Sequence, residues 1–287
     1  ELGLPAGCLV VAGSHDQPAG ALGSGVIQPG VAMDATGTVE CFAVAMQEPV
    51  VNETMLENNL ACYPHAAPSL YVSLAFNFTG GSLFRWVRDN LARGELERAR
   101  QSGRDPYDLL TEQMCDEPTD LFVLPHFTMT GTPHMDANPV GAMVGLSLST
   151  TRGQVLRAVL EGISYEMKLN ADILQRAGVE VNEFRAIGGG AKSDFWLQLK
   201  ADMFNRPVVR LEVAEAASLG MAIAAGVAAG IYESAEGAAE ELIVPQATFT
   251  PDPGRAGYYE EMLAAYRELY PVLKAWQRDT GYRHNAG

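Results

Sequence analysis

The stretch Phe184-Arg185-Ala186-Ile187-Gly188-Gly189-Gly190-Ala191-Lys192-Ser193 carries the strongest indication of the fold. Its first four residues are typical of a strand, and the pattern that follows predicts a helix over 193–205. Three successive glycines between them leave backbone N–H groups uncovered at a helix N-terminus, where the helix dipole favours a phosphate or a polar ligand edge. A tight turn that binds nothing explains the glycines about equally well.

Two familiar nucleotide-binding signatures do not fit this sequence. The P-loop motif places its last glycine directly before the lysine, whereas Ala191 separates Gly190 from Lys192. The dinucleotide fingerprint would need a third glycine after Gly23 and Gly25, at the position of Gln28. A nucleotide site in this chain must therefore be of another kind.

Strand-like and helix-like stretches alternate along the chain, which predicts an α/β fold. Strands are expected at 8–12, 31–36, 39–45, 70–76, 121–124, 184–187 and 208–213. Helices are expected at 18–25, 81–91, 106–115, 152–177, 193–205, 216–232 and 258–277. Residues 92–106 are interpreted as a solvated connection or a short exposed helix, and 125–145 as a long loop of the kind that is often functional.

Composition limits the functions that need to be considered. The 287 residues suffice for one large or two ordinary domains, and 47% of them are hydrophobic, enough for a sizeable core. The formal net charge of −15 disfavours nucleic acid and anionic membranes as partners. The longest uncharged run, 216–232, is rich in Ala and Gly and predicts a buried helix rather than a membrane span. Four scattered cysteines without a CxxC pair favour a reducing cytoplasm.

Residues 12–18 follow an apolar stretch and precede a predicted helix. Asp16 is well placed to cap that helix, and this structural interpretation is the favoured one. The functional alternative makes Asp16 a catalytic carboxylate at a strand end, where α/β folds gather their chemistry, with His15 beside it.

Two glycine-containing turns and one loop are further candidates. Gly37-Thr38 predicts a tight turn that can offer a hydroxyl and backbone amides to a phosphate, although most such turns bind nothing. Gly80-Gly81 predicts a second helix N-terminus with exposed amides. In the long loop, His126, His134 and Asp136 have spacings that match no standard zinc motif, so a structural metal is not expected.

Taken together and in this order, these stretches resemble the C-terminal half of the FGGY carbohydrate kinases. The resemblance is carried by Gly13-Ser14-His15-Asp16-Gln17-Pro18-Ala19-Gly20-Ala21-Leu22-Gly23, Gly37-Thr38, Gly80-Gly81-Ser82-Leu83-Phe84-Arg85-Trp86, Arg157-Ala158-Val159-Leu160-Glu161-Gly162-Ile163, Gly188-Gly189-Gly190-Ala191-Lys192-Ser193 and Glu215-Ala216-Ala217-Ser218-Leu219-Gly220-Met221-Ala222. It extends over nearly the whole chain, and its most specific parts are the triple-glycine block and the segment 215–222.

The resemblance implies an actin-like, ribonuclease-H-like ATPase fold with two domains and an active site in the cleft between them. It implies that 31–287 form the C-terminal nucleotide-binding domain and that 1–30 are the end of the N-terminal, substrate-binding domain. The rest of that domain is then expected to precede Glu1, which agrees with a sequence that does not begin with Met. A homodimer is left open.

The implied reaction is ATP-dependent phosphorylation of a sugar or polyol hydroxyl, of the pentulose kind, with ATP and Mg²⁺ and no metal ligand assigned to this chain. By the resemblance, Asp16 is the catalytic base and Gln17 lies close to the substrate. The same resemblance implies that the nucleotide-binding positions are Gly37, Thr38, Gly81, Gly189, Gly190, Ala191 and Asp194.

This sequence also departs from the family pattern. His15 stands where many members have a small residue, Asp194 stands where glycerol kinase has Asn, and the loop 131–136 matches only loosely. The family's Asp-x-Gly-Thr phosphate motif and most sugar-binding residues have no counterpart here. Two other interpretations therefore remain: a non-catalytic actin-like nucleotide sensor, and a plain structural α/β domain.

Overall fold

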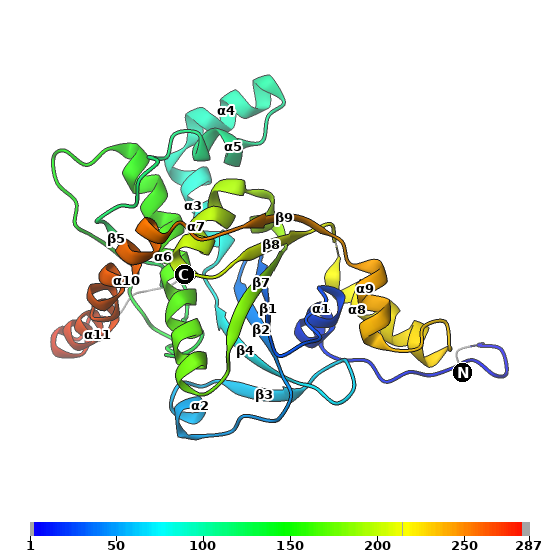
Figure 1. Ribbon diagram of the computed structural model, residues 1–287. Helices are drawn as coiled ribbons and strands as arrows, with labels where there is room; N and C mark the ends of the chain where they lie inside the picture. The colour runs from blue at the N-terminus through cyan, green and yellow to red at the C-terminus, as the bar shows by residue number, and fades with distance from the viewer. Residues whose placement is uncertain (1–2, 214, 283–287) are drawn as a thin grey trace.

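A seven-stranded mixed sheet forms the centre of the molecule in the computed structural model, which describes residues 3–213 and 215–282 (Figure 1). In spatial order its strands are β3 (Ala61–Pro64), β4 (Tyr71–Asn77), β2 (Glu40–Met46), β1 (Gly30–Thr36), β7 (Val181–Ile187), β8 (Val208–Leu211) and β9 (Pro245–Phe249). β1, β7 and β8 run parallel to one another, and the remaining neighbours pair antiparallel.

Strand register brings two distant turns to the same edge of this sheet. β1 and β2 form a hairpin in which Thr36 pairs with Glu40. On its other side β1 pairs in parallel with β7, and Ala35 lies opposite Ile187. The turn that follows β1 and the three glycines that follow β7 are therefore neighbours, because parallel strands end at a common edge.

Helices cover both faces of the sheet (Figure 1). The face with α6 and α7 holds the main core, where Phe42, Phe184 and Phe204 contact one another. The helices on that side are α3 (Gly81–Leu91), α4 (Arg93–Ser102), α5 (Pro106–Thr111), α6 (Arg152–Arg176), α7 (Asp194–Phe204), α10 (Pro253–Arg267) and α11 (Leu269–Thr280), with the short α2 (Glu53–Glu57) at the foot of α6. The other face is covered by α1 (Asp16–Gly23), α8 (Ala216–Ala228) and α9 (Ala235–Leu242).

The predicted α/β fold is confirmed, and most predicted elements match an observed one within a few residues. The stretch 92–106 contains the exposed helix α4, which was one of its two interpretations. The loop 125–145 is irregular except for β6 (Ala142–Val144), which pairs with β5 (Phe122–Leu124). Sequence reasoning missed α2, β3, α9 and β9, because these elements are short and lack a clear period.

Three predictions about individual elements are wrong. Residues 8–12 form no strand, since no neighbouring strand is present in the described part of the chain to accept their hydrogen bonds. The single helix expected at 258–277 is two helices that meet at Glu268, because Pro271 has no N–H to donate to the carbonyl of Arg267. The helix α8 is only partly buried, with one side packed on α1.

Within the described residues, no helix is both long and apolar enough to cross a membrane.

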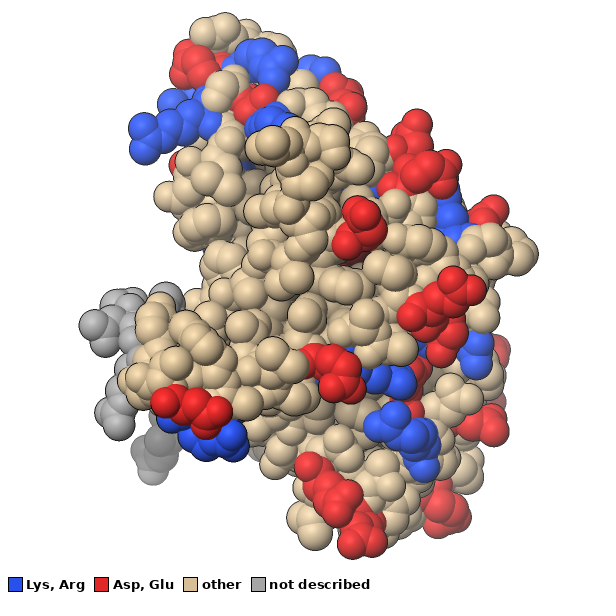
Figure 2. All heavy atoms as spheres, turned by 90° about the vertical axis from the view of Figure 1, so that its left-hand side faces the viewer, with Lys and Arg blue, Asp and Glu red and all other residues tan. Residues whose placement is uncertain are grey.

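Charged side chains of both signs are mixed on the molecular surface that Figure 2 shows. Lys and Arg stand beside Asp and Glu at the top of this view, at the height where Figure 1 places α4, and a broad uncharged area lies below them. The net charge of −15 is thus not gathered into one acidic patch on this face.

Candidate functional site

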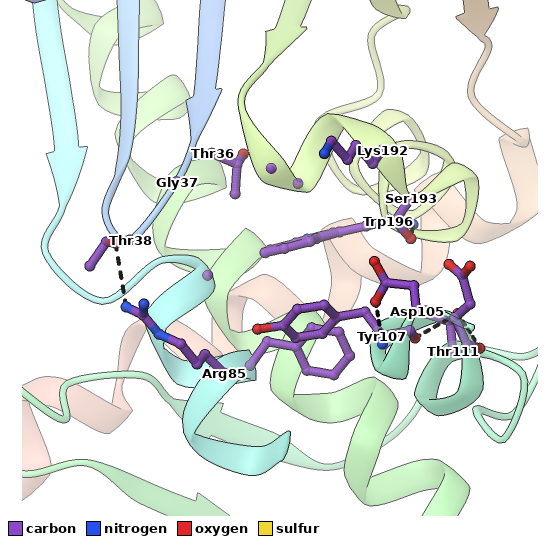
Figure 3. A pocket seen from close by; sticks show the side chains of 15 residues that line it. Thr36, Gly37, Thr38, Arg85, Asp105, Tyr107, Thr111, Lys192, Ser193 and Trp196 are labelled. Atoms are coloured by element: carbon purple, nitrogen blue, oxygen red, sulfur yellow. Dashed lines mark hydrogen bonds between the residues drawn. The ribbon is translucent and has the colours of Figure 1, made fainter. Parts of the chain in front are cut away.

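A cavity of about 290 Å³ opens at the sheet edge where β1 and β7 end (Figure 3). Its wall is built by the β1–β2 turn, the triple-glycine segment, and parts of α3, α5 and α7. The lining residues are Thr36, Gly37, Thr38, Gly81, Phe84, Arg85, Asp105, Tyr107, Asp108, Thr111, Gly189, Gly190, Lys192, Ser193 and Trp196. Of the predicted site residues, the cavity thus brings together Gly37, Thr38, Gly81, Gly189 and Gly190.

The β1–β2 turn is fastened to the start of α3. The N–H of Gly81 donates to the carbonyl of Gly37 (2.9 Å), and the N–H groups of Gly80 and Ser82 donate to the carbonyl of Thr38 (3.1 and 3.2 Å). The expectation of exposed amides at Gly80-Gly81 is therefore wrong, because these donors are already used within the protein. These hydrogen bonds make the turn rigid, and the turn presents the Thr38 hydroxyl to a ligand. Arg85 donates to that hydroxyl oxygen at 3.4 Å.

The triple glycine offers free backbone donors. Gly188 has φ of +84°, a conformation that side chains rarely adopt, and a one-turn 3₁₀ helix follows over Gly189–Lys192. The N–H groups of Gly189 and Gly190 precede the first hydrogen bond of that helix and have no acceptor among the described residues. Both residues line the cavity, so two amides are available there to bind an anion.

Aromatic side chains form the middle of the cavity. Figure 3 shows the Trp196 ring facing the Tyr107 ring across open space, with one ring supplied by α7 and the other by α5. Trp196 is held in place from behind, since its indole N–H donates to Ser164 Oγ at 3.1 Å and its ring packs edge-on against Phe84. A flat apolar ring is the ligand part that such a pair of aromatic walls suits.

The charges around the cavity are separated by sign. Arg85 lies beside the β1–β2 turn, and Lys192 follows the triple glycine (Figure 3). At the far end Asp105 caps α5, its Oδ1 accepting from the N–H of Tyr107 at 2.8 Å, and Asp108 also lines the wall. One end of the cavity therefore favours an anion, and the opposite end favours hydrogen-bond donors.

Asp16 does not line this cavity. It is the first residue of α1, with a side chain 78% exposed, and His15 rather than Asp16 occupies the capping position. Its Oδ1 accepts from the N–H of Gln17 at 2.9 Å and lies 3.4 Å from His15 Nδ1. The pKa of Cys41 is raised above its usual range, mainly by burial and also by the negative charges of Asp34 and Asp16. Cys41 stands near the start of β2, so Asp16 lies close to the same sheet edge, on the α1 side.

The remaining predicted site residues have other contacts. The carbonyl of Ala191 accepts from Arg210 Nε at 2.8 Å, and the Asp194 carboxylate is paired with the guanidinium of the same Arg210. Neither Ala191 nor Asp194 is among the residues that line the cavity. Gln17 is partly buried, and its Oε1 has no hydrogen-bond partner within the described residues.

The described residues contain no group of three or more His, Cys, Asp or Glu side chains that could hold a metal ion. The loop residues His126, His134 and Asp136 serve packing instead. His126 lies 3.2 Å from a buried Glu166 carboxylate oxygen, and His134 stacks on Tyr270 at 3.7 Å between ring centres. Asp136 accepts from the hydroxyl of that tyrosine at 3.0 Å.

Sequence reasoning missed several of the residues that line the cavity. Arg85 and Lys192 stand inside stretches that carry the family resemblance, so their positions could have drawn attention. Asp105 and Tyr107 belong to the α4–α5 region, and no pattern in the sequence indicates that this region folds back over the triple glycine. Trp196 could not be recognised because its position in the sequence is typical of any apolar residue of a helix.

The chain belongs to the FGGY family of carbohydrate kinases: residues 32–229 match the model of that family's C-terminal domain. It is 32% identical over 279 residues to a xylulose kinase of Staphylococcus epidermidis, covering 97% of this chain and 54% of that protein. An autoinducer-2 kinase of Yersinia enterocolitica is 30% identical over 275 residues, which cover 94% and 51%. The crystal structure of a xylulose kinase from Rhodospirillum rubrum superposes with a TM-score of 0.80 at 27% identity, over 96% of this chain and 53% of that one. The chain thus spans about half the length of these relatives, and its fold is that of the FGGY sugar kinases, an actin-like ATPase fold.

Proposed function

We propose that this chain supplies the nucleotide-binding half of an ATP-dependent carbohydrate kinase. The observation that carries the proposal is the cavity at the ends of β1 and β7, in a chain of the FGGY family. It combines free glycine amides and a basic side chain at one end with two facing aromatic rings farther in. A nucleoside triphosphate has the same division into an anionic and a flat aromatic part.

In the proposed complex the phosphates lie against Arg85, Thr38 and the amides of Gly189 and Gly190. The adenine ring lies between Trp196 and Tyr107, and its amino group points toward the acidic end with Asp105. Phosphoryl transfer depends mainly on positioning and on neutralising charge, which fixed amides and a guanidinium supply without rearranging. Gly81 takes part by letting α3 approach the phosphate-binding turn closely, with its amide already bonded to that turn.

The proposed acceptor is a hydroxyl of a sugar or polyol, and a pentulose such as xylulose is the substrate suggested by the relatives. Asp16 is proposed as the base: its carboxylate takes the hydroxyl proton while the oxygen bonds to the γ-phosphorus and ADP departs. Gln17, with its unbonded Oε1, is proposed to contact the sugar. Mg²⁺ would arrive bound to the phosphates, as is usual for this ion, since the described residues contain no group of three or more His, Cys, Asp or Glu side chains that could hold it.

The domain division proposed from the sequence places 1–30 in a substrate-binding domain and 31–287 in the nucleotide-binding domain. The family match, which begins at residue 32, supports that boundary.

We also propose that the kinase works in the cytoplasm, where its four unpaired cysteines would stay reduced. Ala191 and Asp194 are proposed to support the triple-glycine turn through their shared partner Arg210.

Binding of MgADP and turnover test this function separately. The complete gene product that carries this chain should bind MgADP in calorimetry and release ADP from MgATP only when a sugar is added, with pentuloses and polyols as the panel. Binding without any sugar-dependent turnover would favour the nucleotide sensor instead. Absence of both would leave only a structural α/β domain.

A further inference from the structure

A buried cluster of charges lies directly beneath the phosphate-binding turn. The ammonium nitrogen of Lys200 lies 2.6 Å from Asp34 Oδ2, 2.6 Å from Thr36 Oγ1 and 2.8 Å from Glu40 Oε1. Lys200 is 1% exposed, and both acids are fully buried. Asp34 and Thr36 accept hydrogen bonds from the ammonium group, and Glu40 lies beside it as an ion-pair partner, so the lysine is held inside the protein and cannot itself reach a ligand.

The cluster holds the residues that shape the cavity. Thr36 lines the cavity and ends β1, and Glu40 pairs with it across the hairpin, so that the two residues bracket Gly37 and Thr38. Lys200 reaches this hairpin from α7, which also carries Trp196, and its ammonium lies 5.0 Å from the centre of the Trp196 ring. One buried lysine therefore connects the turn at the phosphate end to the aromatic wall.

Charge balance depends on a single proton. With Asp34 and Glu40 both ionised the cluster would carry a net charge of −1, buried beside a site that is proposed to bind an anion. Both carboxylate oxygens of Glu40 are buried and neither has a hydrogen-bond partner within the described residues, an arrangement that strongly disfavours an ionised carboxylate. With Glu40 protonated the cluster is neutral.

The pKa of Glu40 agrees with this assignment. Burial raises this pKa most, Lys200 partly opposes the rise, the Asp34 carboxylate adds to it, and together these effects bring the pKa to about 8. Cys41 adds no charge, because burial and the neighbouring carboxylates raise its pKa as well. The charged groups that face Glu40 are thus Lys200 from α7 and Asp34 from β1, whereas the Cys41 thiol points to the opposite face of the sheet.

We propose that Asp34, Glu40 and Lys200 are positioning residues of the nucleotide site. They hold the β1–β2 turn in the conformation that binds phosphate, and the site binds nucleotide tightly only while Glu40 carries its proton. This inference rests on the proposed function and deepens it. When Glu40 ionises, a buried negative charge appears at the start of β2, beside the turn proposed to hold the phosphates, and repels them. A pair of like charges about 10 Å apart weakens binding roughly tenfold at an effective dielectric constant of about 20.

Nucleotide affinity measured against pH tests the proposal. In the complete gene product, MgADP affinity should fall about fivefold between pH 7 and pH 9 at constant ionic strength, because nucleotide binding itself raises the pKa of Glu40 by about one unit. Glu40→Gln keeps the shape and neutral charge of the protonated acid, so its affinity should stay level over the same range. Glu48→Gln, which changes an exposed acid just after β2, is the matched control and should follow the wild type. Comparing the variants at each pH cancels the titration of the ligand itself.

Proton uptake provides a second measurement that needs no variant. Because a bound anion stabilises the protonated acid, MgADP binding near pH 8 should take up a fraction of a proton, seen as a binding heat that depends on the buffer's ionisation enthalpy. A wild type with level affinity and no proton uptake overturns the proposal, as does a Glu40→Gln protein that loses affinity in parallel with the wild type. Both results leave the nucleotide site itself in place, whereas absence of MgADP binding at pH 7 removes the proposed function and this inference together.

Discussion

The hydroxyl oxygen of Thr36 lies 2.6 Å from the ammonium nitrogen of Lys200, and a Cβ added at Gly190 would lie 2.6 Å from the Thr36 methyl carbon. Thr36 is therefore fixed between a buried charge and the glycine turn. This single side chain sets the spacing between the two turns that are proposed to hold the phosphates.

Gly190→Ala tests this spacing. The added methyl group must displace Thr36, which the buried lysine holds, so the two turns should separate and MgADP affinity should fall about tenfold, equivalent to about 1.4 kcal/mol. Gly257→Ala is the control, since a Cβ at that position of α10 meets nothing within 4 Å. Equal MgADP affinities in the two variants, measured by calorimetry, would show that the turn tolerates a side chain.

Asp16→Asn tests the proposed base. The amide cannot accept the hydroxyl proton, so the rate constant kcat should fall by roughly 10²- to 10⁴-fold. MgADP affinity should not change, because Asp16 does not line the nucleotide cavity. The exposed Asp89, changed to Asn, serves as the control for loss of a surface carboxylate. Full turnover in Asp16→Asn would exclude this carboxylate as the base.

Arg85→Met should separate phosphate binding from base binding. Removal of one charge-assisted contact costs about 1.5–3 kcal/mol, which predicts MgADP affinity weaker by roughly ten- to a hundredfold. Binding of adenosine, which has no phosphate, should be unchanged. Arg93→Met, an exposed change just beyond the same helix, is the control. If adenosine and MgADP lose affinity to the same extent, Arg85 does not mark the phosphate end.

We expect the folded protein to lose stability in mild acid because of the buried His65. It is buried at the turn between β3 and β4, where its Nδ1 accepts from the N–H of Ala67 at 2.8 Å. Burial lowers its pKa from 6.5 to about 4, so the unfolded chain binds the proton more readily. The stabilisation is complete above pH 6.5 and is lost as the pH falls from 6.5 to 4, by about 3 kcal/mol in all.

The difference between wild type and His65→Asn isolates this effect from other titrating groups. The asparagine carbonyl can accept the same N–H bond and does not titrate. Urea denaturation at pH 7, 6, 5 and 4 should therefore show the free energy of unfolding of the wild type approaching that of the variant, or falling below it, as the pH drops. A constant difference across this range would mean that His65 does not titrate in the predicted window.

Local signals explain the elements that could be predicted. Three glycines between a strand and a helix, and Gly37-Thr38 between two apolar strands, have a structural meaning that depends only on their neighbours. Residues 8–12 mislead because an apolar stretch becomes a strand only beside a pairing partner. The free-amide expectation at Gly81 fails for a similar reason, since a distant turn supplies the acceptors.

The α/β class, the family and the two glycine turns can be predicted from the amino-acid sequence, because they follow from short-range periodicity and from the backbone freedom of glycine. The residues that complete the site are set by the three-dimensional fold. Tyr107 and Asp105 reach the cavity from α5, and Lys200 reaches Asp34 across 166 positions of sequence. Contacts of this kind depend on strand order and helix placement, which minimise the free energy of the whole chain and leave no local pattern.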